Sequence, residues 1–84
     1  MLSDEIQKEY LTFCHNIKWT RLHRKLSKKE MAKILKISVG TLTKIENGML
    51  PPRLNVEIFF RVQHCFGIHP VDQLSRRLGD SDVP

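Results

Sequence analysis

The sequence predicts an all-α fold of five helices. Apolar residues recur at spacings of three and four, and Ser, Asn, Pro and Gly stand at the places where helices begin or end. No segment shows the alternating pattern of a strand, and there is no internal repeat or low-complexity stretch. In a chain of 84 residues, we therefore expect one domain over residues 1–79 and a flexible tail over 80–84.

The first three helices are predicted over residues 3–25, 28–35 and 39–46. The first stretch holds no Gly or Pro, and Ile6, Tyr10, Phe13 and Ile17 form its inner stripe. Ser27 and Glu30 have the spacing of a capping box, which starts the second helix. Ser38 caps the third, and Asn47-Gly48 ends it.

Two further helices are predicted over residues 56–66 and 70–78. Asn55 caps the fourth, which ends at Gly67, and Pro70 occupies the first position of the fifth, which ends at Gly79. Val71, Leu74 and Leu78 should face inward in this last helix. The predicted core consists of Phe13, Ile17, Leu26, Met31, Leu35, Leu42, Ile45, Val56, Phe59, Val62, Phe66 and Leu74.

Several classes of protein are excluded by composition. No run of 18 apolar residues occurs, so the chain should not span a membrane. Asp4, Glu5 and Glu9 stand where a signal peptide needs a basic and then an apolar stretch, which predicts a cytoplasmic protein. Cys14 and Cys65 are expected to be reduced thiols that fill small gaps in the core.

Positive charge is concentrated in the middle of the chain. The net charge is +5, but residues 18–45 hold nine Lys and Arg side chains against Glu30 alone, a local charge of +8. Residues 1–17 carry −2 and residues 46–84 carry −1. A basic block of this kind attracts nucleic acid or anionic lipid, although charge alone favours an ordinary solvated helix surface.

The helices at 28–35 and 39–46 are short and joined by three residues, which is the geometry of a helix-turn-helix. The stretch Leu26 to Gly48 also resembles the lambda-repressor and Cro type of helix-turn-helix, the XRE family. The resemblance extends more loosely from Ile17 to Leu78. The matching positions are Leu26, Ser27, Ala32, Leu35, Ile37, Ser38, Leu42, Ile45, Glu46, Asn47 and Gly48.

The resemblance implies a sequence-specific regulator of transcription that binds double-stranded DNA and represses by occupying a promoter. Helix 39–46 would be the recognition helix in the major groove, and Arg21 would pair with Glu46. The implied DNA-binding residues are Lys28, Lys29, Val39, Gly40, Thr41, Thr43, Lys44, Asn47 and Arg53. The sequence departs from the family at Lys28, where Gln is usual, and at Lys36, where a left-handed Gly is usual.

Lys28 and Lys29 also stand out without the resemblance. A cation at a helix N-terminus opposes the helix dipole at a cost of about 0.3–1 kcal/mol. A DNA phosphate at that end would be bound by both ammonium groups and the free amides together. The alternative is an exposed lysine pair, and phosphate contact is the better explanation of the two.

No cofactor, metal or catalytic activity is expected. Cys14-His15 and His64-Cys65 are adjacent pairs, and neighbours on a helix point about 100° apart, which is unsuited to one ion. Five short helices offer no obvious pocket for an enzyme. A homodimer is expected because one short recognition helix distinguishes poorly between DNA sequences. The candidate residues for the dimer contact are Phe60, Leu78 and Leu11.

The alternative to DNA binding is a protein-interaction module, or an antitoxin-like partner-binding protein, on the same fold. Val39 and Gly40 are unusual for reading bases, and Trp19, Ile34, Leu50 and Phe60 exceed what a five-helix core requires. The basic block argues against this alternative, because a peptide-binding module does not require cations around the helices that face DNA.

Overall fold

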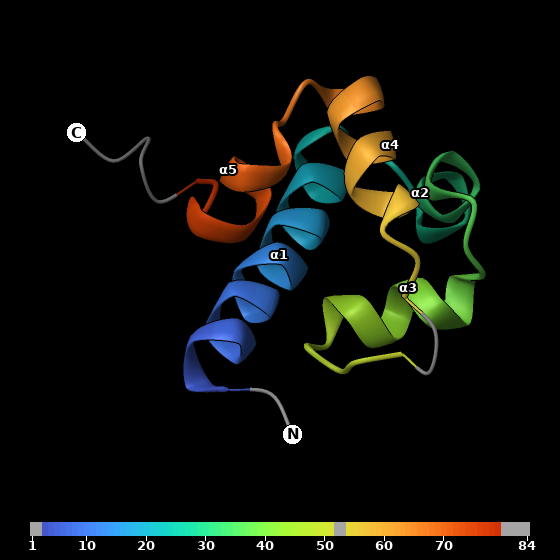
Figure 1. Cartoon of the computed structure of the whole chain (residues 1–84). Coiled ribbons are helices and arrows are strands. Elements are labelled where there is room, and N and C mark those ends of the chain that lie inside the picture. The colour runs from blue at the N-terminus through green and yellow to red at the C-terminus, as the bar shows by residue number, and fades with distance from the viewer. Residues whose placement is uncertain (1–2, 52–53, 80–84) are drawn as a thin grey trace.

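The computed structural model describes residues 3–51 and 54–79, and these form five α-helices with no strand (Figure 1). The helices are α1 Asp4–His23, α2 Lys28–Leu35, α3 Val39–Glu46, α4 Glu57–Phe66 and α5 Pro70–Ser75. The prediction of an all-α fold is confirmed, and the bounds of α2 and α3 agree with those predicted. Arg53 and the predicted tail at 80–84 lie outside the described residues.

The long helix α1 runs through the middle of the bundle and contacts α5 on one side and α3 on the other (Figure 1). Helix α2 packs against α3 and α4, and α4 packs against α5. This arrangement leaves α2 and α3 together at one side of the molecule. Among the described residues, no helix is long and apolar enough to cross a membrane.

The starts of α1, α2 and α3 are set by serine hydroxyl groups. Ser27 Oγ accepts the amide of Glu30 at 3.1 Å, and the Glu30 carboxylate accepts the amide of Ser27 at 2.9 Å. Ser38 Oγ likewise accepts the amide of Thr41 at 3.0 Å, and Ser3 Oγ accepts that of Ile6 at 3.2 Å. These bonds join residues three apart, so each cap depends only on local sequence.

The core lies where α1, α2, α3 and α4 meet. Phe13 contacts Phe59 of α4, with ring centroids 4.7 Å apart. Fully buried side chains include Phe13, Ile17, Met31, Leu35, Leu42, Ile45 and Val62, all of which were predicted. Four other predicted core residues, Leu26, Phe59, Phe66 and Leu74, are half-buried against this cluster.

Two apolar residues at helix starts are exposed, contrary to prediction. Val56 is 66% exposed, because the Asn55 side chain accepts the amide of Glu57 at 2.9 Å and the helix begins one residue later than expected. Ile58 is buried in its place. Ile6 is 52% exposed, since residues before Tyr10 in α1 are not covered by the bundle.

The fifth helix ends at Ser75, three residues before its predicted end. Asn16 of α1 is buried, and its Nδ2 donates to the carbonyl groups of Gln73 and Arg76, each at 2.8 Å. Its Oδ1 accepts the amide of Leu78 at 2.8 Å. The backbone groups that would have continued the helix are therefore bound by a side chain of α1.

The buried face of α5 also differs from the prediction. Val71 is 62% exposed and Leu78 is half-buried, while Gln73 is fully buried. Gln73 Nε2 donates to the carbonyl groups of Phe59 at 2.8 Å and Ile68 at 2.7 Å. A buried amide can replace an apolar residue when it satisfies backbone carbonyls in this way.

Candidate nucleic-acid interface

The turn between α2 and α3 holds the two helices in a fixed relation. Lys36 has the left-handed conformation, with φ 56° and ψ 46°, and the amide of Ile37 donates to the carbonyl of Ala32 at 3.0 Å. A left-handed conformation costs a residue with a Cβ about 1 kcal/mol, a cost that Gly avoids. Lys36 therefore adopts the left-handed conformation in which the family usually has Gly, although its side chain makes that conformation less favourable.

A buried ion pair ties α1 to the end of α3, as the resemblance implied. Arg21 Nε lies 2.7 Å from Glu46 Oε2, and Arg21 Nη2 donates to Glu46 Oε1 at 3.0 Å. Arg21 Nη1 also donates to the carbonyl of Leu26 at 3.2 Å. The hydrogen bonds from Arg21 to Glu46 raise the pKa of the guanidinium. Such a two-bond geometry orients α3 against α1.

The predicted base-reading residues differ in exposure along α3. Val39 is 44% exposed, and Gly40 and Lys44 are also exposed, while Thr41 and Thr43 are half-buried. A Cβ on Gly40 would meet only Ser38 Oγ, at 3.9 Å, so no neighbour within the chain requires glycine there. The hydroxyl of Thr41 accepts from Ser38 Oγ at 2.9 Å and so belongs to the helix cap.

The start of α2 lies beside the exposed face of α3. Lys28 Nζ donates to Thr43 Oγ1 at 3.5 Å, and Lys29 is exposed next to it. The first amides of a helix have no acceptor within the helix, and Lys28 and Lys29 occupy the first two positions of α2. The structure thus joins Lys28 and Thr43, two predicted site residues that are 15 positions apart in the sequence.

The loop that follows α3 is held by a residue that the sequence did not single out. The hydroxyl of Tyr10 in α1 donates to the carbonyl of Met49 at 2.7 Å. Burial raises the pKa of Tyr10, which keeps this donor protonated. Asn47, another predicted site residue, is exposed at the end of α3, two residues before Met49. The only sequence signal for Tyr10 was its place on the inner stripe of α1.

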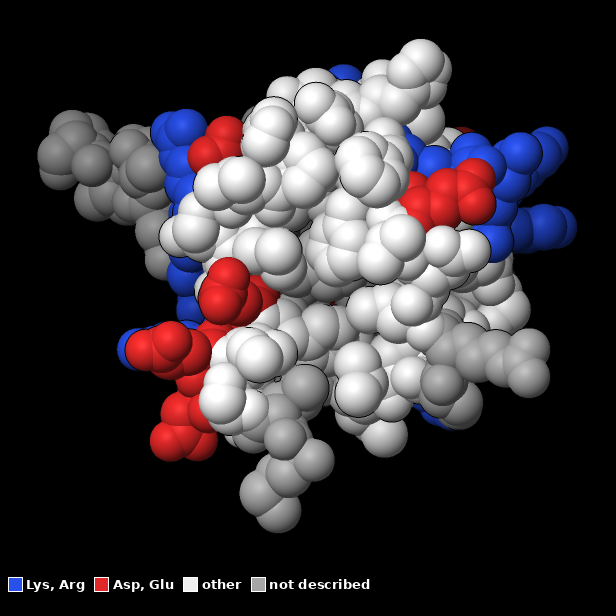
Figure 2. Space-filling view, in the orientation of Figure 1, with Lys and Arg blue, Asp and Glu red and all other residues white. Residues whose placement is uncertain are grey.

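Charge is unevenly distributed over the molecule (Figure 2). Acidic side chains gather over the start of α1, at the lower left of that view, and the sequence of this segment holds Asp4, Glu5 and Glu9. The Lys and Arg side chains of the segment 18–45 belong to the end of α1, to α2, to α3 and to the turns between these helices. Five of these nine cations lie on α2, on α3 or in the turn between them: Lys28, Lys29, Lys33, Lys36 and Lys44.

The helix-turn-helix family model of the lambda-repressor and Cro type, the XRE family, matches residues 17–79. The chain belongs to this family. The family is one of DNA-binding regulators, which supports a DNA-binding role for the surface of α2 and α3. No curated protein and no solved structure is significantly similar to the chain.

Two of the four apolar residues that seemed surplus are accounted for by the fold. Ile34 packs against the core, and Trp19 stacks on His23 with ring centroids 4.4 Å apart. Leu50 and Phe60 are exposed, by 57% and 61%. These two remain candidates for contacts with another molecule.

Cysteine and histidine side chains form no common site in the part of the chain that the structure describes. Cys14 is buried, and burial raises the pKa of its thiol. Cys65 is exposed, so the prediction that it fills a core gap is wrong. No group of three His, Cys, Asp or Glu residues among those described is placed to hold a metal ion.

Proposed function

We propose that the protein is a repressor of transcription that reads double-stranded DNA with α3 in the major groove. The observation that carries this proposal is the contact between Lys28 of α2 and Thr43 of α3. This contact brings the ammonium group of Lys28 to the side of α3 that carries Thr43. This arrangement places a helix in the groove and cations at the flanking phosphates.

Lys28 and Lys29 contact phosphates in this proposal, together with Asn47 and Arg53, which follow α3 in the sequence. A phosphate at the start of α2 accepts hydrogen bonds from free amides and neutralises two ammonium groups, which oppose the helix dipole when no anion is bound. These contacts set the position of the protein on DNA but carry no sequence information.

Base reading falls to Val39 and Lys44, which are exposed, and to Thr43, which is half-buried. Val39 contacts a thymine methyl, Lys44 donates to guanine O6 or N7, and Thr43 hydrogen-bonds to a base edge. Thr41 lies beside them, and Gly40 allows the backbone to approach the bases closely. Three side chains on two helical turns can distinguish only weakly between DNA sequences. Most of the affinity for DNA therefore comes from contacts with phosphates.

Repression follows from occupancy. A protein bound across a promoter excludes polymerase from the same DNA, and this requires no property beyond DNA binding. The proposal is therefore tested first by binding and then by the ability of one bound duplex to block transcription in a purified system.

Fluorescence anisotropy with random and selected duplexes at several salt concentrations tests the proposal. We expect the Lys28→Ala/Lys29→Ala variant to lose affinity on every duplex and to lower the salt slope by about two, one for each phosphate contact. The matched control is Lys8→Ala, which removes a lysine of α1 outside the basic segment and should leave the slope unchanged.

Absence of binding by the wild-type protein even at low salt would replace this proposal with the protein-interaction module. Equal affinity for every duplex would keep DNA binding and remove sequence-specific reading.

We further propose that the working unit is a homodimer that uses α4. Phe60 is exposed, and Val56 lies four residues before it and is also exposed. Leu78 is a weaker candidate than predicted, because its backbone is bound by Asn16 and its carbonyl accepts from His15 Nε2 at 3.0 Å. Leu11 is exposed but lies on α1.

Sedimentation at micromolar concentration, with and without a palindromic duplex, tests the dimer. Phe60→Asp should give a monomer, whereas Val71→Asp, which changes an equally exposed apolar residue on α5, should not. A wild-type protein that stays monomeric on the duplex would contradict the dimer.

A further inference from the structure

A hollow of about 270 Å³ lies where the end of α2, the turn after it and residues 54–61 meet. We call it the turn hollow. Four of its lining residues are apolar: Leu35 and Ile58 are buried, and Ile37 and Leu54 are half-buried. Its volume is at the lower end of the range for small-molecule sites, so the turn hollow fits only a small ligand.

The charged residues that line the turn hollow leave one cation without a partner. The guanidinium of Arg61 donates to the carboxylate of Glu57, one turn earlier on α4, so these two charges offset each other. The side-chain oxygen of Asn55 is also occupied, because it accepts the amide of Glu57 at 2.9 Å. The ammonium group of Lys36 has no hydrogen-bond or ion-pair partner among residues 3–51 and 54–79. The lining therefore carries one net positive charge, and that charge belongs to Lys36.

The backbone of Lys36 also indicates a role for its side chain. With φ 56° it is left-handed, a conformation that is unfavourable for a residue with a Cβ, and such conformations cluster at sites that bind ligands. Complementing the dipole of α2 does not by itself require this lysine, because Lys33 already places a cation in the last turn. An anion bound beside the ammonium group would explain why a lysine stands at this position.

The apolar lining and the single cation together define the class of ligand. An anion with an apolar body satisfies both, because it pairs with Lys36 and covers Ile37 and Leu54. A DNA phosphate satisfies only the first, since it has no apolar group to enter the hollow. Lys36 also follows the last residue of α2, at the opposite end of that helix from Lys28 and Lys29, the proposed phosphate contacts. A small apolar carboxylate therefore matches the lining best.

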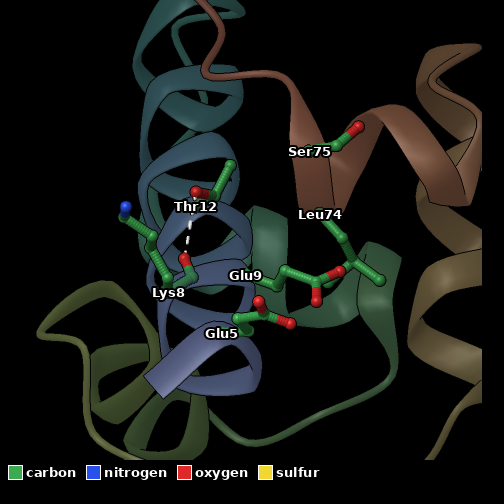
Figure 3. Close-up of a pocket in the computed structure, with 6 residues that line it drawn as sticks. All are labelled: Glu5, Lys8, Glu9, Thr12, Leu74 and Ser75. Atoms are coloured by element: carbon green, nitrogen blue, oxygen red, sulfur yellow. Dashed lines mark hydrogen bonds between the residues drawn. The ribbon is translucent and has the colours of Figure 1, made fainter. Parts of the chain in front are cut away.

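A hollow of similar size between α1 and α5 has the opposite charge. It measures about 300 Å³, and Figure 3 shows Glu5 and Glu9 of α1 extending toward Leu74 and Ser75 of α5. Lys8 also lines it, so two carboxylates stand against one ammonium group. This acidic hollow should repel a carboxylate ligand and therefore serves as an internal control for the turn hollow.

We propose that the turn hollow binds a small carboxylate that has an apolar body, such as an aromatic or short aliphatic acid. The carboxylate pairs with the ammonium group of Lys36, and the apolar body lies against Ile37, Leu54 and Ile58. A ligand in this position contacts both the turn of the helix-turn-helix and α4. The turn hollow contains none of the residues proposed to contact DNA, so the proposal does not depend on DNA binding.

The test is a titration of the isotope-labelled, full-length chain at low salt, followed by amide chemical shifts. Benzoate is the probe, and two control ligands each remove one of its features: benzamide lacks the charge, and acetate lacks the apolar body. We expect saturable shifts at Ile37, Leu54 and Ile58 with benzoate in the millimolar range. Benzamide should bind about threefold more weakly and acetate about tenfold more weakly. Thr12 and Ser75, which line the acidic hollow, should not shift.

Two variants separate the charge at the turn hollow from the charge of the helix. Lys36→Met keeps the apolar stem of the side chain but removes the ammonium group, and should weaken benzoate binding about threefold. It should leave benzamide binding unchanged, a difference that a purely structural effect would not produce. Lys33→Met removes a cation from the last turn of α2 outside the hollow and should change the binding of neither ligand. Thermal melts of both variants check that the fold is intact.

Several outcomes would overturn the proposal. One is equal affinity for benzoate and benzamide; another is benzoate binding that Lys36→Met leaves unchanged; a third is the absence of saturable shifts at the lining residues. Shifts confined to the start of α2 would assign benzoate to Lys28 and Lys29 instead. A DNA duplex that shifts the turn hollow in the wild type but not in Lys36→Met would assign this lysine to DNA.

Discussion

The helix-turn-helix formed by α2 and α3 and the C-terminal pair α4 and α5 are made of similar short helices, yet they depend on different information. The starts of α2 and α3 are determined by Ser27, Glu30 and Ser38, which bond to residues three positions away. The end of α5 is determined by Asn16, about 60 residues earlier in the chain. Local caps can be recognised in a sequence, whereas a distant side chain that ends a helix cannot.

The largest expected effect concerns the ion pair that joins the first region to α1. Arg21→Ala leaves the Glu46 carboxylate, whose side chain is 2% exposed, without its partner and should lower the free energy of unfolding by about 3–5 kcal/mol. Chemical denaturation measures the loss. Arg21→Ala/Glu46→Ala should recover part of it, because no buried charge is then left unpaired; a double variant as unstable as the sum of both singles would contradict this account.

Asn16→Ala tests the hydrogen bonds that join α1 to the C-terminal pair, α4 and α5. It removes three hydrogen bonds to the backbone of residues 73–78 and should cost about 2–4 kcal/mol. Hydrogen exchange should show faster opening of α5 than of α2 and α3. Thr12→Ala is the control on the same helix, since its hydroxyl donates only to Lys8 in its own helix, and it should cost less than about 0.5 kcal/mol.

Lys36→Gly should stabilise the protein by about 1 kcal/mol, because glycine adopts the left-handed conformation of the turn without strain. Lys33→Gly removes the same charge and side chain from the interior of α2 and should destabilise by about 1 kcal/mol. Thermal unfolding compares the two. A change in stability of the same sign in both variants would mean that the turn is not strained at Lys36.

Gly40→Ala separates stability from binding. Alanine has room at this helical position and should raise stability by about 0.5–1 kcal/mol. If the first turn of α3 approaches base edges closely, the same methyl group should weaken DNA binding about tenfold. Binding that stays unchanged would show that Gly40 does not face DNA.

The smallest expected effect is at the capping box. The hydrogen bond from the Ser27 amide lowers the pKa of Glu30, so the charged form stabilises the fold above the ordinary glutamate value of 4.5. This contribution is lost as the pH falls through the lowered pKa. Melting temperatures of wild type and Glu30→Gln should therefore differ slightly at neutral pH and converge in acid; a difference that persists in acid would assign it to hydrogen-bond geometry.

In the candidate DNA surface, as in the fold, some features could be predicted from the sequence and others depend on how the helices pack. Sequence reasoning and the resemblance predicted that Lys28, Lys29 and residues of α3 contact DNA. They did not predict the contact between Lys28 and Thr43, because that distance depends on how α2 and α3 are packed. Tyr10, which holds the loop after α3, was also not identified, since nothing in the sequence marks a core tyrosine as a donor to Met49.

The sequence by itself determined the all-α class, the limits of α2 and α3, most of the core and the position of the basic block. Periodicity, capping residues and charge are properties of short segments, so they can be read without knowing the fold. The tertiary structure alone decided that Gln73 is buried and Val71 exposed, and that α5 stops at Ser75. Those outcomes depend on which backbone groups Asn16 and Gln73 reach, and that follows only from the packing of distant helices.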